Sequence, residues 1–477
     1  MMRLAEAAAM LNVPFNGADA DVLRVSTDSR SILPGDLFIA LRGDKFDGGA
    51  FAERAIQQGA VGVVLDRTQA PGITTAIRVD DTRLALGKLA AAWRAQFSLP
   101  VVAVTGSNGK TTVKEMLAAI LRVEAGSEEV VLHTEGNLNN DIGLPLMLLR
   151  LRETHQFAVF EMGMNHAGEI DYLTRLARPD VAVVNNAMTA HIGFLGSVEN
   201  IARAKGEIFN GLSGAGIAVF NADDPHAWLW REFNTQRSVT DFGLTQPAAV
   251  RGQYQPTEYG AALTLVLPNA TLEIALQVPG EHNVMNALAA AATAFALDVS
   301  HRSIVAGLSG FTGVKGRMER KAALHGSTFI DDTYNANPDS VKAALAVLAQ
   351  QAGKKVLVLG DMGELGTEAG AMHAQIGLAA RAAGVDRLLA LGELTRETVG
   401  AFGAGAMHFE RIQELLAELE NELTPETTVL VKGSRFMQME RVVQSFMEYP
   451  TALQPGHKHP TALQPGHLSP QRGDKEN

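Results

Sequence analysis

The chain has 477 residues, of which 46% are hydrophobic and 19% are charged. At about 100 to 200 residues per domain, this length predicts about three domains and excludes a single small binding module. The net charge of −11 argues against general binding to nucleic acids or acidic membranes, because long-range repulsion opposes the encounter. Cysteine does not occur, so disulfides, thiolate nucleophiles and thiolate metal sites are excluded, and the chemistry must use oxygen and nitrogen atoms.

The N-terminal stretch MMRLAEAAAMLNVPF lacks the apolar core and the cleavage site of a signal peptide. Apolar runs stay well short of the roughly 20 residues that cross a bilayer, and the alanine-rich stretch 287–297 ends at Asp298. We therefore expect a cytoplasmic protein that does not insert into membranes.

Residues 1–95 combine β-branched runs such as 61–66 with helical stretches such as 50–58, which predicts a small N-terminal α/β domain. In residues 96–314, buried-strand candidates alternate with helical segments, a pattern typical of a mainly parallel sheet covered on both faces. A strand-rich segment at 250–278 interrupts the alternation and is expected to add an antiparallel edge. The parallel-strand candidates are 99–104, 157–163, 181–187 and 216–222.

The alternation resumes after about residue 315, which predicts a third, Rossmann-like α/β domain over residues 315–449 with its own sheet. Residues 450–477 contain PTALQPGH twice and lack apolar periodicity, so we expect a disordered tail. Three histidines in the tail offer a metal only weak binding, because a flexible segment supplies no fixed geometry. They are His457, His459 and His467.

The strongest local signal is TGSNGKTT at residues 105–112, between a predicted buried strand and a predicted helix. Its glycines allow backbone N–H groups to approach phosphate oxygens, Lys110 can reach the β and γ phosphates, and the Thr111 hydroxyl can bind Mg²⁺. Val104 stands where the general P-loop pattern has its first glycine, which leaves Gly106 to make the turn. The pattern favours ATP or GTP binding over a purely structural glycine turn.

Two further polar residues follow predicted strands. Glu161 ends the strand at 157–163 and His191 follows the strand at 181–187, and the carboxyl ends of parallel strands face the ligand crevice. Glu161 is a candidate direct or indirect Mg²⁺ ligand, the alternative being an acid that binds a neighbouring loop. A single histidine is more often structural than functional, so His191 gains meaning only together with the other residues.

Three more residues have a structural explanation when each is taken alone. Lys205 lies in a helical run, where a solvated surface lysine is expected. Asn283 and Asn286 are three residues apart at the start of the alanine-rich helix, so they share one helical face. Their amides either cap the helix or hydrogen-bond an adenine.

In this order, the motifs resemble the Mur ligase family of ATP-dependent amino-acid ligases, over residues 1 to about 447. TGSNGKTT is similar to the family's form of the P-loop, including the missing first glycine. The other matching elements are EMG at 161–163, His191, Lys205, HNVMN at 282–286, Arg317 and Asp332. Four segments resemble the members that join D-alanyl-D-alanine to a UDP-N-acetylmuramoyl-tripeptide, namely 135–145, 161–170, 331–340 and 360–366.

The resemblance implies a role for each matching residue. One Mg²⁺ is expected on Thr111 and Glu161 and a second on His191, with Lys205 carrying a carbamate, formed with CO₂, that supports the second site. Asn108 is expected near the transferring phosphoryl group. The resemblance further implies that ATP is held by Gly106, Ser107, Asn108, Gly109, Lys110, Thr111 and Thr112 at its phosphates, by Asn283 and Asn286 at the adenine, and by Arg317 and Asp332 at phosphate and ribose when the third domain closes.

Substrate contacts are implied by the same resemblance. STDSR at 26–30 and LRGDKFDGG at 41–49 resemble loops that hold the UDP group, with Ser29 and Arg30 favoured, although a polar turn explains them equally well. Thr134, Asn137 and Asn139 match substrate contacts in the central domain. The loops 335–340 and 361–366 are candidates for reading the dipeptide. We expect a monomer that acts on small molecules and binds no nucleic acid.

The implied reaction has two steps. The terminal carboxylate of the UDP-linked tripeptide attacks the γ-phosphate of ATP, and the amine of D-alanyl-D-alanine then displaces phosphate from the acyl phosphate. A ligase that adds one amino acid, including a folylpolyglutamate synthetase, is the alternative within the family. A nucleotide-dependent switch and a structural scaffold are the alternatives outside it.

Overall fold

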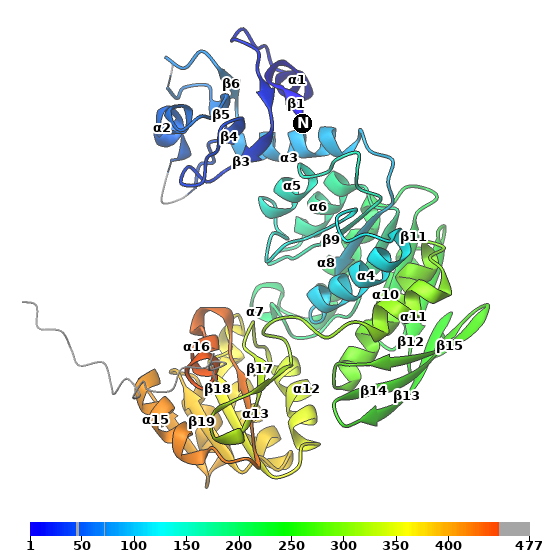
Figure 1. The fold of residues 1–477 in the computed structure, drawn as a ribbon, viewed down its shortest axis with the longest axis vertical. Helices are drawn as coiled ribbons and strands as arrows, with labels where there is room; N and C mark the ends of the chain where they lie inside the picture. The colour runs from blue at the N-terminus through cyan, green and yellow to red at the C-terminus, as the bar shows by residue number, and fades with distance from the viewer. Residues whose placement is uncertain (44–46, 71, 448–477) are drawn as a thin grey trace, which may run out of the picture.

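The computed structural model describes residues 1–43, 47–70 and 72–447. Three α/β parts, each with a sheet, follow one another along the chain, and the first and third lie at opposite ends of the molecule (Figure 1). The expected tail at 450–477 and its three histidines lie outside the described residues, as do positions 44–46 of one expected UDP loop.

The first part contains a short antiparallel pair, β1 (Met2–Arg3) with β2 (Asp21–Val22), and a four-stranded parallel sheet. The order in this sheet is β3 (Arg24–Ser26), β4 (Asp36–Ile39), β5 (Gly62–Asp66) and β6 (Ala76–Val79). The accompanying helices are α1 (Leu4–Met10), the 3₁₀ turn η1 (Gly48–Phe51) and α2 (Ala52–Gln57). The helix expected at 50–58 is therefore a 3₁₀ turn continued by an α-helix.

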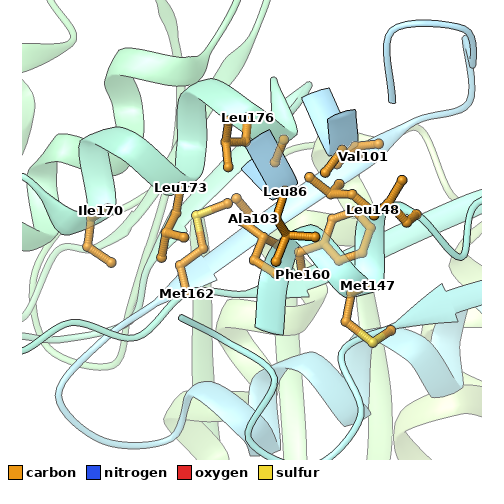
Figure 2. Packing of buried hydrophobic residues seen from close by; sticks show 14 of the residues in the cluster. Leu86, Val101, Ala103, Met147, Leu148, Phe160, Met162, Ile170, Leu173 and Leu176 are labelled. Atoms are coloured by element: carbon orange, nitrogen blue, oxygen red, sulfur yellow. The ribbon is translucent and has the colours of Figure 1, made fainter. Parts of the chain in front are cut away.

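Helix α3 (Thr82–Arg94) joins the first sheet to the central one. It begins at Asp81, whose carboxylate accepts hydrogen bonds from the N–H groups of Arg83 and Leu84. Near its end, Trp93 Nε1 donates to the carbonyl of Leu151 at 3.2 Å. Figure 2 shows Leu86 of α3 among apolar side chains of the central part, so one continuous core connects the two.

The central sheet has nine strands, in the order β15-β14-β13-β12-β11-β10-β7-β9-β8. The seven strands from β7 to β13 pair in parallel. Strands β13, β14 and β15 pair antiparallel, which confirms the expected antiparallel edge. Their bounds are β7 (Val101–Thr105), β8 (Val131–His133), β9 (Phe157–Glu161), β10 (Val181–Val184), β11 (Ile217–Asn221), β12 (Ser238–Gly243), β13 (Val250–Thr257), β14 (Gly260–Leu267) and β15 (Ala270–Leu276).

Both faces of the parallel part of the central sheet are buried, as its continuous apolar runs predict, whereas β13 and β15 alternate buried and exposed residues. Val102 and Val104 of β7 belong to one core cluster, and Val101 and Ala103 belong to the opposite one. One face is covered by α4 (Lys110–Ala125), α10 (Glu281–Ala296) and α11 (His301–Ser309), and the other by α3, α5 (Gly143–Leu148), α6 (Glu169–Ala177) and α8 (Val198–Gly206). Shorter elements are α7 (Ile192–Leu195), η2 (Glu207–Gly211) and α9 (Ala227–Phe233).

The third part has a six-stranded sheet in the order β16-β17-β21-β18-β19-β20. Its bounds are β16 (Glu319–Ala322), β17 (Thr328–Asp332), β18 (Lys354–Gly360), β19 (Arg387–Leu391), β20 (Ala406–Phe409) and β21 (Thr427–Lys432). The main helices are α12 (Pro338–Ala349), α13 (Ala369–Ala382), α14 (Thr395–Phe402), α15 (Ile412–Glu422) and α16 (Glu440–Ser445). The edge strands β16 and β20 escape the sequence pattern, because edge strands need no continuous apolar run.

None of the helices within residues 1–43, 47–70 and 72–447 is long and apolar enough to cross a bilayer.

A close contact between α11 and α4 holds the helix that follows the P-loop. A Cβ atom added at Gly307 would lie 2.5 Å from the Cα of Ile120. We expect Gly307→Ala to push the helices apart and to destabilise the protein by about 1–3 kcal/mol, measured by urea unfolding. The control is Gly400→Ala in α14, where nothing lies within 4 Å and alanine should stabilise the helix by about 0.5–1 kcal/mol. A Gly307→Ala protein as stable as the wild type would contradict this packing.

Candidate active site

A cleft of 1470 Å³ lies between the central and third parts of the molecule. The P-loop and the segments that follow β9, β10 and β11 supply one wall, because the carboxyl ends of these parallel strands meet at one edge of the sheet. Segments that follow β17, β18 and β21 supply the opposite wall. The site is therefore completed by two separate sheets.

The P-loop connects β7 to α4, with Gly109 in the left-handed region at φ 79°. A Cβ atom at this position would lie 2.2 Å from Oδ1 of Asn286, so both the conformation and the space require glycine. Two amides hold the preceding residue: Asn186 Oδ1 accepts from the N–H of Asn108 at 2.9 Å, and Asn185 Nδ2 donates to its carbonyl at 3.0 Å. The turn is shaped by side chains from β10 and α10.

Lys110 lies at the start of α4, with Nζ donating to the carbonyl of Gly106 at 2.8 Å. Burial lowers the pKa of Lys110, and the nearby Glu161 carboxylate opposes this shift. An anion bound at the loop would favour the charged form of this lysine.

Glu161 at the end of β9 is fixed on several sides. Thr111 Oγ1 donates to its Oε2 at 2.8 Å, and Asn139 Nδ2 donates to its Oε1 at 2.8 Å. Thr134 is fully buried and accepts the N–H of Glu161 at 2.9 Å, so it supports the strand end rather than lining the cleft. The hydroxyl and carboxylate oxygens of Thr111 and Glu161 are ligands of the kind that Mg²⁺ prefers.

His191 and Glu364 meet across the cleft. His191 precedes α7 with φ 66°, and its Nδ1 lies 2.7 Å from Oε2 of Glu364, which belongs to the loop after β18. The histidine holds the pKa of Glu364 below its usual value. The two parts of the molecule are thus in polar contact at the position of His191.

Lys205 is not the surface residue that its local sequence suggests, because only 1% of it is exposed. Burial lowers the pKa of Lys205 well below its usual value, and the positive charge of Lys110 lowers it further. Among the described residues, no carboxylate offsets these two effects. The structure therefore favours a neutral amine here.

The third part reaches the P-loop directly. Arg317 Nη2 donates to Thr111 Oγ1 at 2.9 Å, and Asn337 Nδ2 donates to Asn108 Oδ1 at 2.7 Å. Asp339 Oδ2 accepts from the N–H of Thr189 at 2.9 Å. These contacts close the third part against the loop.

The two asparagines of α10 lie side by side and are buried, with Asn286 Nδ2 donating to Asn283 Oδ1 at 3.2 Å. The helix begins at Glu281, earlier than expected, and its N-cap is Gly280, so neither amide has the capping role considered above. Both residues line the cleft, as does Asp332.

Some expected site residues lie away from the cleft. Arg30 is exposed and forms an ion pair with Asp28 at 2.8 Å in the first part of the molecule. Ser29 lies beside it in the chain, in the turn after β3. Of the expected residues, the described cleft lining lacks Ser29, Arg30, Gly106, Thr134 and Lys205 and includes Ser107, Asn108, Gly109, Lys110, Thr111, Thr112, Asn137, Asn139, Glu161, His191, Asn283, Asn286, Arg317 and Asp332.

Several residues of the site were missed by sequence reasoning. Asn185 and Asn186 directly follow a buried strand, so the rule that singled out Glu161 would have found them. Asp339 and Glu364 meet their partners only through long-range folding, for which the sequence offers no local signal.

The comparisons with known proteins cover most of the chain. Three family models match: Mur ligase family, catalytic domain, at residues 22–94; Mur ligase middle domain at 104–294; and Mur ligase, glutamate ligase domain, at 316–435. The UDP-N-acetylmuramoyl-tripeptide--D-alanyl-D-alanine ligase of Escherichia coli strain K12 is 42% identical over 456 residues, covering 94% of this chain and 99% of the relative.

Solved structures agree. A crystal structure of MurF from Acinetobacter baumannii matches with a TM-score of 0.85 and 38% identity, covering 93% of this chain and 97% of that one. MurF ligase from Thermotoga maritima in complex with ADP matches with a TM-score of 0.79 and 27% identity, covering 88% and 96%. Since sequence and fold agree along almost the whole length, the chain belongs to the Mur ligase family.

Proposed function

We propose that this chain is an ATP-dependent ligase that joins D-alanyl-D-alanine to UDP-N-acetylmuramoyl-tripeptide in peptidoglycan precursor synthesis. The observation that carries the proposal is a P-loop whose Thr111 and Asn108 form hydrogen bonds with Arg317 and Asn337 of the third part, across the cleft. Such a site can bring a nucleotide and an acceptor together. The E. coli relative supplies the identity of the proposed substrates.

The proposed nucleotide site follows the wall of the central sheet. The backbone of residues 106–112 and the Lys110 ammonium would hold the phosphates of ATP, with the N–H groups of Ser107 and Asn108 bonded to Asn186 and keeping the loop in shape. Asn283 and Asn286 would contact the adenine, and Arg317 and Asp332 would contact phosphate and ribose. The T. maritima relative, solved in complex with ADP, supports the binding of an adenine nucleotide.

In the proposed reaction, a carboxylate attacks a polyanionic nucleotide, so the main barrier is electrostatic repulsion. Lys110 and Arg317 would stabilise the charge that spreads over the transferring phosphoryl group, and Asn108 would orient it. Bound Mg²⁺ would neutralise phosphate charge, with Thr111 and Glu161 as protein ligands of one ion and His191 as a ligand of the other. Contacts from the third domain would exclude water from the acyl phosphate.

Among the described residues, His191 is the side chain assigned to the second ion. Within the described residues, no group of three or more His, Asp or Glu side chains is arranged to hold a metal. Lys205 supports a modified ligand, because its neutral amine can add to CO₂, losing a proton and leaving an anionic carbamate. The Lys110 ammonium would then attract the carbamate, whereas it disfavours a positive charge on Lys205.

The proposed roles divide among three domains, at residues 1–95, 96–314 and 315–449. Ser29 and Arg30 in the first domain would contact the UDP group, and Asn137 and Asn139 would contact the rest of that substrate, while Thr134 supports the neighbouring Glu161. The loops at 335–340 and 361–366 would bind the dipeptide and distinguish it from other acceptors. We further propose that the chain acts as a monomer on these small-molecule substrates. The substrates suggest a cytoplasmic location.

The acceptor decides between this proposal and its alternatives. We expect phosphate release that requires ATP, Mg²⁺, the UDP-linked tripeptide and D-alanyl-D-alanine, with a product heavier than the tripeptide by the dipeptide less water, measured by mass spectrometry. Phosphate release with single amino acids would instead indicate a ligase of the same family that adds one amino acid. Release without any acceptor would favour a nucleotide switch.

The carbamate is tested at Lys205. We expect Lys205→Ala to lower the ligation rate about 100-fold, as loss of a group that supports a metal ligand does, and short carboxylates such as acetate to restore part of it. The matched control is Lys114→Ala, since Lys114 is equally buried but donates to the carbonyl of Thr134, so added carboxylate should not rescue it. Full activity of Lys205→Ala would overturn the carbamate assignment.

A further inference from the structure

The segment that joins the central domain to the third domain carries Arg317. It makes a tight turn, with a bridge between Val314 and Arg317 and with Met318 in the left-handed region at φ 52°. Residues other than glycine rarely adopt this conformation without support from their surroundings. Two tyrosines from different domains provide contacts on either side of Arg317.

Tyr334, which follows β17, lies under the guanidinium. The Cζ atom of Arg317 is 4.2 Å from the centre of the Tyr334 ring, within the range of a cation–π interaction. The N–H of Tyr334 also donates to the carbonyl of Gly316 at 3.1 Å. Ring and backbone of one residue therefore hold both the side chain and the turn that presents it.

Within the part of the chain that the structure describes, the guanidinium of Arg317 forms no ion pair with an acid and donates to Thr111 instead. Its Nε is buried and has no hydrogen-bond partner among the described residues, while Nη2 donates to Thr111 of the P-loop. The Tyr334 ring is thus a principal support for a charged group aimed at the proposed phosphate site.

Tyr259 supports the other side of the turn from the central domain. It lies between β13 and β14, and its hydroxyl donates to the carbonyl of Met318 at 2.5 Å. Burial raises the pKa of Tyr259, so its hydroxyl remains a donor at physiological pH. The bond holds the residue next to Arg317 in its unusual conformation.

We propose that Tyr334 and Tyr259 are positioning residues that hold Arg317 against the P-loop, the first through its ring face and the second through its hydroxyl. Arg317 then meets the nucleotide phosphates with little further ordering, which favours binding. The inference rests on the proposed function, because it assigns Arg317 an anionic phosphate as its target.

The test measures binding of ATP to the full-length chain by titration calorimetry. We expect Tyr334→Leu to weaken binding about 5- to 30-fold and Tyr334→Phe, which keeps the ring, to stay within about twofold of wild type. Tyr259→Phe should weaken binding about 2- to 10-fold. In an Arg317→Ala background, neither Tyr334→Leu nor Tyr259→Phe should weaken binding further.

The matched control is Tyr254→Phe. Tyr254 lies in β13, in the same β13–β14 hairpin as Tyr259, and its hydroxyl donates to Oε2 of Glu281 at 2.7 Å. The effect of Tyr254→Phe should be the same with and without Arg317. Additive losses from Tyr334→Leu and Arg317→Ala, or equal losses from Tyr334→Leu and Tyr334→Phe, would overturn the inference and leave the proposed function standing. A wild-type chain that binds no ATP would overturn the proposed function itself.

Discussion

The backbone of the P-loop at Asn108 and Gly109 is constrained by amide side chains from two other segments, and the geometry of the cleft depends on this constraint. The N–H and the carbonyl of Asn108 bond the side chains of Asn186 and Asn185, and the carboxamide of Asn286 leaves no room for a side chain at residue 109. Backbone N–H groups can face a phosphate only when the loop is kept in such a conformation. A strand end and a helix of the same domain therefore set the shape of the turn.

The third domain adds to this preformed loop rather than reshaping it. Asn337 contacts the side chain of Asn108, and Arg317 contacts the hydroxyl of Thr111. Both contacts are hydrogen bonds between polar groups that water can also satisfy, so their net contributions are modest, about 1 kcal/mol for the amide pair and about 1.5–3 kcal/mol for the charged guanidinium. A ligase that must admit three substrates and then exclude water needs a closure of this reversible kind.

Much of this arrangement could be predicted from the sequence, and the reasons are physical. Strands such as β7 and β9 are buried on both faces, so their apolar runs are visible in the chain, and Glu161 could be placed at the crevice because it ends such a run. The burial of Lys205 could not be predicted in this way, because its helix has an ordinary polar composition and only the family resemblance singled it out. The contact of Thr189 with Asp339 and the edge strands β16 and β20 depend on long-range packing, which leaves no periodic signal.

The two ends of the central domain are joined to their neighbours by different forces. Toward the first domain, α3 buries Leu86 and Trp93 in a shared apolar core. Separating these surfaces would cost about 25 cal/mol for each square ångström of apolar area exposed to water. Toward the third domain, the contacts include hydrogen bonds such as those of Arg317 and Asn337, whose polar groups water can also satisfy. Thermal motion should therefore separate the molecule unevenly: the first and central domains travel as one body, and the third domain swings alone.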